Sequence, residues 1–154
     1  MNVDYAAAPD YTPWLDLARE VEPLFGPMAD DPGFQDALKQ AISEKTAFCV
    51  RTGTNGREPA LKGGIVISRE ANEILWVAVS QAFRGKGAGK ALLAFAMEEL
   101  DRTTPIRVQT FDGSTPEGRA ARALYKDFGF SDHEDGGPNP AGIPTVIMQC
   151  CPTP

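Results

Sequence analysis

The chain has few of the residues that build metal sites and disulfide frameworks. Its 154 residues include three cysteines and a single histidine, His133. Three cysteines cannot form a complete set of disulfides, and the spacing of Cys49, Cys150 and Cys151 fits no zinc-binding motif. The sequence therefore predicts neither a metal site nor a disulfide framework. Cys49 lies in the apolar run AFCV, which predicts a small core residue.

Long hydrophobic runs and an excess of basic residues are also missing. No apolar run approaches the ~20 residues of a membrane span, and the N-terminal MNVDYAAAPDY is too acidic and too weakly apolar for a signal peptide. The 21 acidic residues outnumber the 15 lysines and arginines, which argues against a general nucleic-acid binder. The acidity permits a cationic substrate, although it is also the commonest way to stay soluble. We therefore expect a cytoplasmic protein with no nucleic-acid partner and no membrane partner.

What the chain does contain is a regular succession of helical and strand patterns. Its length of 154 residues predicts one domain, residues 1–154. Two helices open it, at Thr12-Pro13 and at Asp31-Pro32, because each pair offers a cap and the proline favoured in a first turn. No convincing strand precedes them, and the order thereafter is β-β-β-α-β-α-β-β. Five of these six strands have clear patterns, at 47–51, 61–68, 73–79, 106–111 and 145–151, and helical patterns cover 89–102 and 116–128.

The connections between these segments indicate a mixed sheet. Asn55-Gly56 marks a turn between strands 47–51 and 61–68, which makes them antiparallel neighbours. The segment EDGGPNPAG, 134–142, predicts a loop. Strand 73–79, EILWVAV, is almost continuously apolar, which predicts burial on both faces. A β-α-β crossover follows it, so the predicted class is α/β with early antiparallel strands.

A glycine-rich segment, VSQAFRGKGAGKALL at 79–93, follows a strand and opens a helix. A helix N-terminus offers free backbone N–H groups, and Arg84, Lys86 and Lys90 add positive charge, so a phosphate-bearing ligand is expected. Two nucleotide motifs fail here. The P-loop lacks its first glycine, replaced by Arg84, and its hydroxyl residue, replaced by Ala91; the dinucleotide fingerprint has Lys90 in place of its third glycine. An ordinary structural turn stays an alternative.

The same segment resembles the acetyl-CoA-binding motif of the GNAT superfamily of N-acetyltransferases. The core of that motif, [R/Q]-x-x-G-x-[G/A], is matched by Arg84, Gly87 and Gly89. The segment GRAARALYKDFGF, 118–130, resembles the second family motif, N-x-x-A-x-x-L-Y-x-x-x-G-F. The resemblance covers residues 47 to 150. The matching residues of the second motif are Ala121, Leu124, Tyr125, Gly129 and Phe130.

Two departures from the family pattern stand near the second motif. Gly118 occupies the position where the family often has Asn, which removes a ligand contact or a helix cap. The preceding link, FDGSTPEG at 111–118, is longer than usual. Both departures affect the expected geometry of the acceptor side more than the binding of the cofactor.

The resemblance implies a single-domain GNAT-like fold, with a mixed, mostly antiparallel sheet of about six strands flanked by about four helices. It implies direct transfer of an acetyl group from acetyl-CoA to a primary amine of a small molecule or peptide, in a ternary complex without a metal. The pantetheine arm would pair with the strand end at Val77 and Val79, where the family splays two strands apart. A homodimer is a further implication. The cofactor pyrophosphate would bind the loop of Arg84, Gly85, Lys86, Gly87, Ala88, Gly89 and Lys90.

The resemblance also suggests the residues that move protons. Tyr125 matches the general acid of the family, and its alternative is a core tyrosine packed under the sheet. An alkylammonium acceptor needs a base or a water path. Glu73, at the start of the central strand, is the predicted base, because some family members have a carboxylate there. Asp112 and His133 lie in predicted loops near the expected acceptor side. Each of these three residues is more typical of plain surface, and ordered water is another route.

Three functions remain open at this stage. The first is an acetyl-CoA-dependent N-acetyltransferase, the second a catalytically silent CoA-binding or sensor module of the same fold, and the third a nucleotide-binding protein. An intact Tyr125 favours the enzyme. The two N-terminal helices, with Trp14, Phe25 and Phe34, are predicted to roof the acceptor pocket, although these aromatics are more typical of core. The sequence does not distinguish small amines, amino acids, antibiotics and protein N-termini as acceptors.

Overall fold

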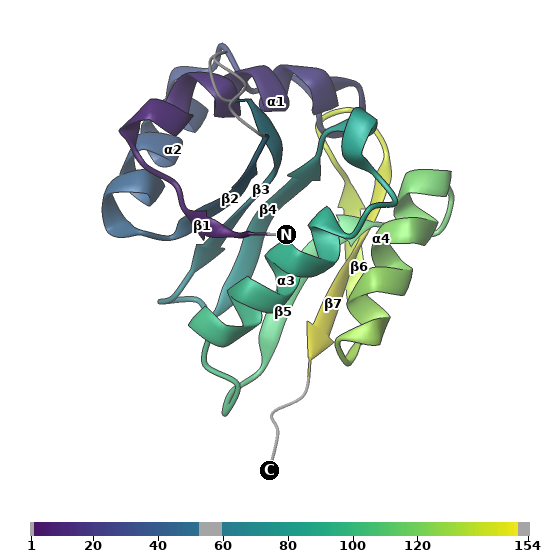
Figure 1. The fold of residues 1–154 in the computed structure, drawn as a ribbon. Helices are drawn as coiled ribbons and strands as arrows, with labels where there is room; N and C mark the ends of the chain where they lie inside the picture. The colour runs from purple at the N-terminus through teal and green to yellow at the C-terminus, as the bar shows by residue number, and fades with distance from the viewer. Residues whose placement is uncertain (1, 53–59, 151–154) are drawn as a thin grey trace.

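The computed structural model describes residues 2–52 and 60–150, so the predicted turn at Asn55-Gly56 and the predicted strand end at Cys151 lie outside the described residues. Within these ranges one sheet of seven strands runs through the molecule in the order β1-β2-β3-β4-β5-β7-β6 (Figure 1). Neighbouring strands are antiparallel except β4 and β5, which are parallel, as the predicted crossover requires. The strands are β1 Asp4–Tyr5, β2 Ala47–Arg51, β3 Leu61–Ser68, β4 Glu73–Val79, β5 Ile106–Phe111, β6 Phe130–Pro138 and β7 Pro144–Cys150.

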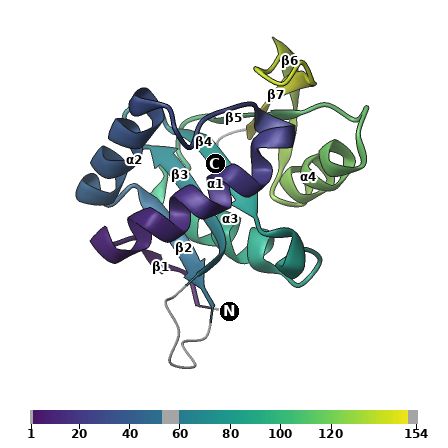
Figure 2. The ribbon, with the colours of Figure 1, turned by 90° about the horizontal axis from the view of Figure 1, so that it is seen from above.

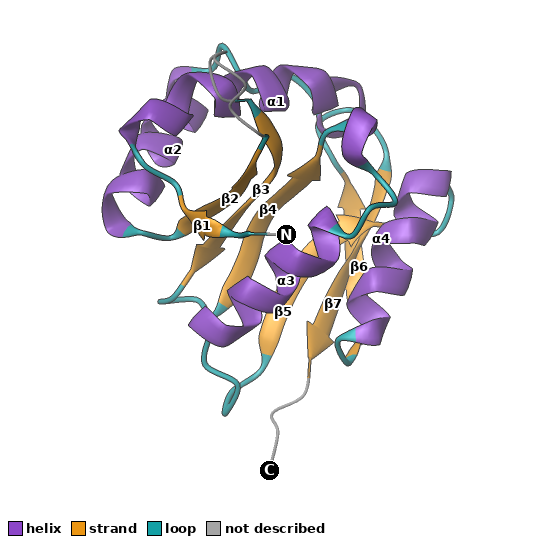
Figure 3. Ribbon diagram, viewed as in Figure 1, coloured by secondary structure: helices purple, strands orange, loops and turns teal. Residues whose placement is uncertain are grey.

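The helices cover both faces of the sheet, α1 and α2 on one and α3 and α4 on the other (Figures 1, 2 and 3). The prediction of about four helices is confirmed. In the described ranges none of them is long and apolar enough to cross a bilayer. The helices are α1 Tyr11–Phe25, α2 Pro32–Glu44, α3 Ala88–Glu99 and α4 Pro116–Asp127, with short 3₁₀ turns η1 Ala8–Asp10 and η2 Gln81–Phe83.

Strand β2 shows how the sheet divides the core into two layers. Phe48 and Val50 pack with Leu92 on the α3 side, whereas Ala47 and Cys49 belong to the cluster under α1 and α2. The alternation follows because successive residues of a strand point to opposite faces. Cys49 is fully buried, as predicted, and burial raises the pKa of its thiol to about 12. The thiol therefore stays protonated at ordinary pH.

The start of α1 differs from the prediction by two residues. The helix begins at Tyr11, so Thr12 lies inside the first turn and is not the cap. Asp10 stands in the cap position, but its carboxylate does not bond to the helix. It is buried and accepts two hydrogen bonds from the Arg51 guanidinium, at 2.9 Å from Nε and 2.7 Å from Nη2. The local cap rule fails here because a charged partner from β2 competes for the carboxylate.

Both edges of the sheet extend beyond the prediction. β1 precedes the helices, where no strand was predicted, and a 2.9 Å bond from Arg51 to Asp4 ties it to β2. Two residues are too few to display a strand period in the sequence. At the other edge β6 takes in Gly136-Gly137, which was predicted as loop. Two register shifts against β7 absorb this irregular segment.

β4 is partly exposed, although its sequence predicted burial on both faces. It pairs with β5 only through Glu73 with Arg107 and Ile74 with Val108. Beyond Ile74 the two parallel strands separate, and Leu75 is 57% exposed. The prediction of two-sided burial is therefore wrong for the second half of β4, because its apolar residues line the opening between the strands as well as contacting the core.

Candidate functional site

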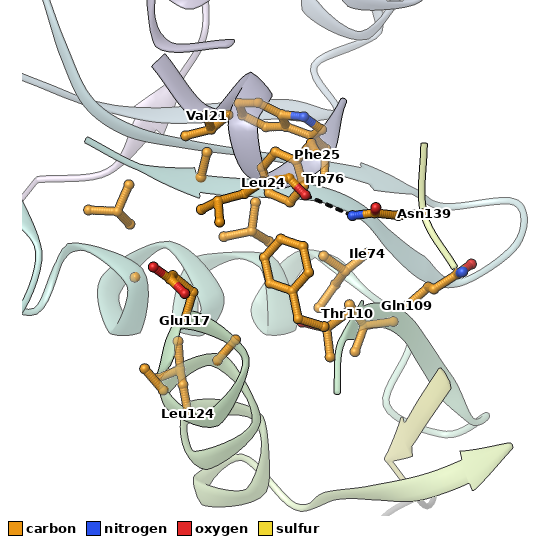
Figure 4. Close-up of a pocket in the computed structure, with 18 of the residues that line it drawn as sticks. Val21, Leu24, Phe25, Ile74, Trp76, Gln109, Thr110, Glu117, Leu124 and Asn139 are labelled. Carbon is orange, nitrogen blue, oxygen red and sulfur yellow. Dashed lines mark hydrogen bonds between the residues drawn. The ribbon is translucent and has the colours of Figure 1, made fainter. Parts of the chain in front are cut away.

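A cavity of about 870 Å³ lies where β4 and β5 separate. Its walls come from the second half of α1 and the loop after it, from both separated strands, from the loop before α3, from α4 and from the β6–β7 connection. Figure 4 shows Leu24, Phe25 and Trp76 along one side, and Glu117 and Leu124 of α4 on the opposite side. The volume falls within the usual range for small-molecule and cofactor sites.

The glycine loop before α3 contributes one part of the wall. Gly85 and Gly87 have φ of +75° and +90°, a region that glycine adopts readily and other residues do not. A Cβ on either would meet nothing within 4 Å, so the loop conformation, and not packing, requires glycine. No side chain caps α3, whereas Asp31 caps α2 and Thr115 caps α4. The first N–H groups of α3 thus have no capping partner and suit an anion.

The three cations of this loop are only partly brought together. Arg84 and Lys90 line the cavity. The Arg84 Nε donates to the carbonyl oxygen of Val79 at 3.1 Å, which closes the loop onto the end of β4. Lys86 is not among the lining residues, and its Nζ lies 5.9 Å from the centre of the Phe83 ring. Two cations therefore face the cavity and a third lies beside it.

The remaining residues predicted to bind the cofactor lie together on the wall. The start of α3 packs between α4 and β4, because a Cβ on Gly89 would lie 3.4 Å from Leu124 Cδ2 and 3.7 Å from Val79 Cγ2. The glycine loop, the free half of β4 and α4 therefore form one continuous surface. The residues of this prediction that line it are Val77, Val79, Gly85, Gly87, Ala88 and Gly89.

Tyr125 lines the cavity from α4. It is 5% exposed, and its ring packs edge to face on Phe130 with the centroids 5.6 Å apart. Burial raises the pKa of Tyr125 above its ordinary value, so the phenol is protonated over the whole neutral range. Tyr125 is therefore a core residue that also forms part of the cavity wall. Its role as general acid stays a prediction.

The carboxylate predicted as base is not brought to the cavity. Glu73 is the first residue of β4, and the lining of that strand begins one residue later. Asp112 and His133 do not line the cavity either. Hydrogen bonds from Ser114 hold the pKa of Asp112 below its usual range. Among the described lining residues the only carboxylate belongs to Glu117, in the first turn of α4, which the sequence analysis placed only within the helical pattern 116–128.

Gly118 keeps the helix cap that its departure from the family motif was expected to remove. The N–H of Gly118 donates to Thr115 Oγ1 at 3.0 Å, which closes the first turn of α4. A Cβ on Gly118 would lie 1.9 Å from the carbonyl oxygen of Asp112. The link before α4 folds back so tightly that only glycine fits, which accounts for the absence of Asn.

The β6–β7 connection is a wall of the cavity that the sequence predicted only as a loop. Its Asn139 Nδ2 donates to the carbonyl oxygen of Leu24 at 2.8 Å, drawn as a dashed line in Figure 4. Its Oδ1 accepts from the backbone of Ala141 at 2.9 Å and Ile143 at 3.0 Å. One side chain thus shapes the turn and attaches it to α1. Nothing in the composition of the loop indicates this partner.

The three aromatic residues predicted to roof the cavity have different positions. Phe25 lines it. Trp14 is fully buried beneath, 5.6 Å from Trp76 between ring centroids, and Phe34 lies 6.3 Å from the same indole. Trp76 itself lines the cavity. In residues 2–52 and 60–150 no group of three His, Cys, Asp or Glu side chains is arranged to hold a metal ion.

Comparison with known proteins gives a family match that includes β4, the glycine loop and α4. The profile of the acetyltransferase (GNAT) domain matches residues 45–132, more than half of the chain. No match was found among curated proteins. Many solved structures share the fold.

Three of these structures illustrate the likeness. A GNAT-family acetyltransferase from Bacillus cereus has a TM-score of 0.73 at 16% identity, covering 99% of this chain and 98% of its own. The ribosomal-protein-S18-alanine N-acetyltransferase of Escherichia coli has a TM-score of 0.68 at 17% identity, covering 99% of this chain and 94% of its own. The diaminobutyrate acetyltransferase EctA of Paenibacillus lautus was solved with L-2,4-diaminobutyric acid and coenzyme A. It has a TM-score of 0.70 at 18% identity, covering 98% of this chain and 94% of its own. At these identities the likeness is one of fold.

Proposed function

Because this chain belongs to the GNAT acetyltransferase family, we propose that it transfers an acetyl group from acetyl-CoA directly to a primary amine in a ternary complex. One observation carries the proposal. The parallel strands β4 and β5 separate beside a buried Tyr125, and an uncapped helix N-terminus with two cations lies on the same cavity wall.

The cavity wall suits both chemical parts of this cofactor. The pyrophosphate would bind the backbone N–H groups of residues 84–90, with Arg84 and Lys90 as counter-charges. The pantetheine amides would pair with the edge of β4 around Val77 and Val79, which β5 leaves free. The structural neighbour from Paenibacillus lautus contains coenzyme A, which supports this reading.

Acetyl-CoA supplies an acetyl group that is activated as a thioester. During transfer a C–N bond forms, the C–S bond breaks, the amine loses a proton and the leaving sulfur gains one. Tyr125 is the proposed proton donor, since it lines the cavity and its raised pKa keeps the phenol protonated. A donor to the leaving sulfur makes the thiolate a better leaving group.

The proton of the amine needs a separate route, because an alkylammonium has a pKa of ~10.4. The assignment of Glu73 as base stays a prediction, and its position outside the cavity lining counts against it. Glu117 lines the cavity, but it lies on the α4 side, opposite Phe25 and Trp76, and so away from the wall predicted to cover the acceptor. We therefore propose that water in the cavity carries this proton to solvent.

A silent CoA-binding module is the alternative that the same cavity permits. It would bind the cofactor through the same loop and strand edge, but it would need no proton donor at Tyr125. The intact tyrosine on the wall favours the enzyme. A nucleotide-binding protein is disfavoured, because neither nucleotide motif is complete in the loop.

Turnover over an amine panel tests the proposal. The purified chain is mixed with acetyl-CoA and each amine, and free CoA is measured by chromatography, with Tyr125→Phe as the matched variant. We expect CoA release that depends on the amine and falls in the variant. Binding of acetyl-CoA without release on any amine would instead establish the silent module. Tighter binding of ATP than of acetyl-CoA would point to the nucleotide-binding function.

A further inference from the structure

We propose that the acceptor is a compact primary amine on an apolar or aromatic body, without a second charged group, as in the arylalkylamines. This inference rests on the proposed function, because it names the acceptor of the same site. It follows from the side of the cavity opposite α4, formed by α1, the loop after it, the separated strands and the β6–β7 connection.

Among the described lining residues, charged side chains are confined to the cofactor side of the cavity. Arg84 and Lys90 belong to the glycine loop and the start of α3, and Glu117 belongs to α4. The described lining from α1, β4, β5 and the β6–β7 connection includes no charged side chain. A polyamine would bury a second ammonium there without a carboxylate, and a diamino acid would also bury a carboxylate without a cation. Unpaired buried charge is costly, so both classes are disfavoured.

The uncharged polar side chains of that side are largely engaged within the protein. Gln109 Nε2 donates to Thr145 Oγ1 at 2.9 Å and to the Gly136 carbonyl at 3.1 Å, and the Thr145 hydroxyl donates to the Gly137 carbonyl at 2.7 Å. Both amide atoms of Asn139 are also bonded within the protein. An acceptor therefore finds few free hydrogen-bonding groups, and recognition depends on shape and apolar contact.

Aromatic rings supply that contact. Phe25 of α1 stacks on Phe111 of β5 with the centroids 5.2 Å apart and the planes at 17°. It also lies 6.1 Å from Trp76 of β4. All three line the cavity, and Figure 4 shows Phe25 and Trp76 side by side on one wall. An aryl or alkyl body gains buried apolar area against this wall, and its ammonium can bind a ring face before it loses its proton.

The contact between α1 and the β6–β7 connection limits the size of the acceptor. The Asn139 amide holds the Leu24 carbonyl at 2.8 Å. A Cβ on Gly26, which has φ of +96°, would lie 2.7 Å from Pro140 Cβ. The two segments therefore touch with no room for a methyl group between them. An acceptor that extends between these two segments, as a long chain would, has to break this contact, whereas a compact amine that stays within the cavity does not.

Tryptophan fluorescence tests the acceptor class without depending on turnover. The chain has two tryptophans, and Trp76 lines the cavity while Trp14 is fully buried. The protein, saturated with CoA, is titrated with 2-phenylethylamine, 2-cyclohexylethylamine, spermidine, L-2,4-diaminobutyrate and an alanine-initiated tetrapeptide. We expect the first two to reach half-saturation at concentrations at least ~10-fold lower than the other three, which corresponds to about 1.4 kcal/mol. Comparable affinity for spermidine, diaminobutyrate or the peptide would overturn the inference, as would no response to any amine.

A matched pair of variants separates apolar recognition from a general loss of structure. Phe25→Leu keeps the wall apolar and should keep the order of preference. Phe25→Glu introduces a carboxylate and should shift the preference towards spermidine; an unchanged order in a folded Phe25→Glu protein would contradict the inference. If that variant does not fold, the titration of wild type and Phe25→Leu still decides. Selective binding without acetyl transfer would refute the proposed function alone, so the two failures are distinguishable.

Discussion

Gly118 of α4 lies against the carbonyl oxygen of Asp112 so closely that a Cβ would stand 1.9 Å from it. This contact links the end of β5 to the first turn of the helix that carries Tyr125. The glycine therefore determines where α4 begins relative to the sheet.

Substitution of Gly118 by alanine should destabilise the protein, although alanine is the better helix former. Backbone atoms have to move to make room, so we expect a loss of more than ~2 kcal/mol and a fall in Tm of about 5 °C or more. Gly113→Ala is the control, since its nearest neighbour is the flexible tip of Arg122 at 3.3 Å. Thermal unfolding of both variants checks this, and equal Tm values would refute the steric account.

Substitution of Gly87 by valine should weaken acetyl-CoA binding by at least ~10-fold, because the side chain and the altered loop obstruct the N-terminus of α3. Gly142→Val is the matched control. Gly142 has φ of +82° and open space around its Cβ, as Gly87 does with φ of +90°, but it does not line the cavity. Titration of each variant with acetyl-CoA in thermal unfolding compares them. The loop assignment fails if both variants bind equally well.

Tyr125→Phe should lower kcat about 100-fold while leaving the acetyl-CoA affinity within about twofold, as expected for a lost general acid. Tm should change little, because the variant keeps the buried ring and loses only the hydroxyl. Burial raises the pKa of this phenol, so the wild-type kcat should not fall through ionisation of Tyr125 up to its ordinary value of ~10. The same shift means that the contribution of Tyr125 to stability is complete below that pH and is lost as the pH rises above it. Steady-state kinetics across pH measure the kcat of the variant and the pH dependence of the wild-type kcat. An unchanged kcat in the variant would exclude the acid role.

Glu73→Gln should lower kcat/KM by less than about threefold, because Glu73 lies outside the cavity lining. A loss of ~100-fold or more, together with loss of the acidic limb of the pH profile, would instead establish Glu73 as the base. Asp127→Asn, near the end of α4, serves as a surface control for the change of charge.

Local features of this protein were predictable from its sequence. The cap at Asp31, the glycine loop at the start of α3 and the position of Tyr125 on a helix each depend on a few neighbouring residues. Residue type and spacing therefore suffice to predict them. The identity of the ligand was predicted from the resemblance to the family motifs, because the loop alone is compatible with a structural turn as well as a phosphate site.

Features that depend on distant partners were not predictable. Asn139 bonds to the carbonyl of Leu24, 115 positions away, and no local pattern encodes that pairing. The apolar residues of β4 were predicted to be buried on both faces, because a residue that faces a ligand cavity and one that faces another side chain can be equally apolar. Asp10 has the chemistry of a cap but binds Arg51 instead. Each error arises where a tertiary contact overrides a local preference.

Thermal unfolding with and without acetyl-CoA, with ATP as the control, tests the central claim most directly. A ligand at a hundred times its Kd stabilises the folded state by ~2.7 kcal/mol, which should raise the Tm of a domain of this size by several degrees. The account predicts that shift with acetyl-CoA and none with ATP. No shift at saturating acetyl-CoA would contradict it, because the loop at 84–90 would then be only a turn between a strand and a helix.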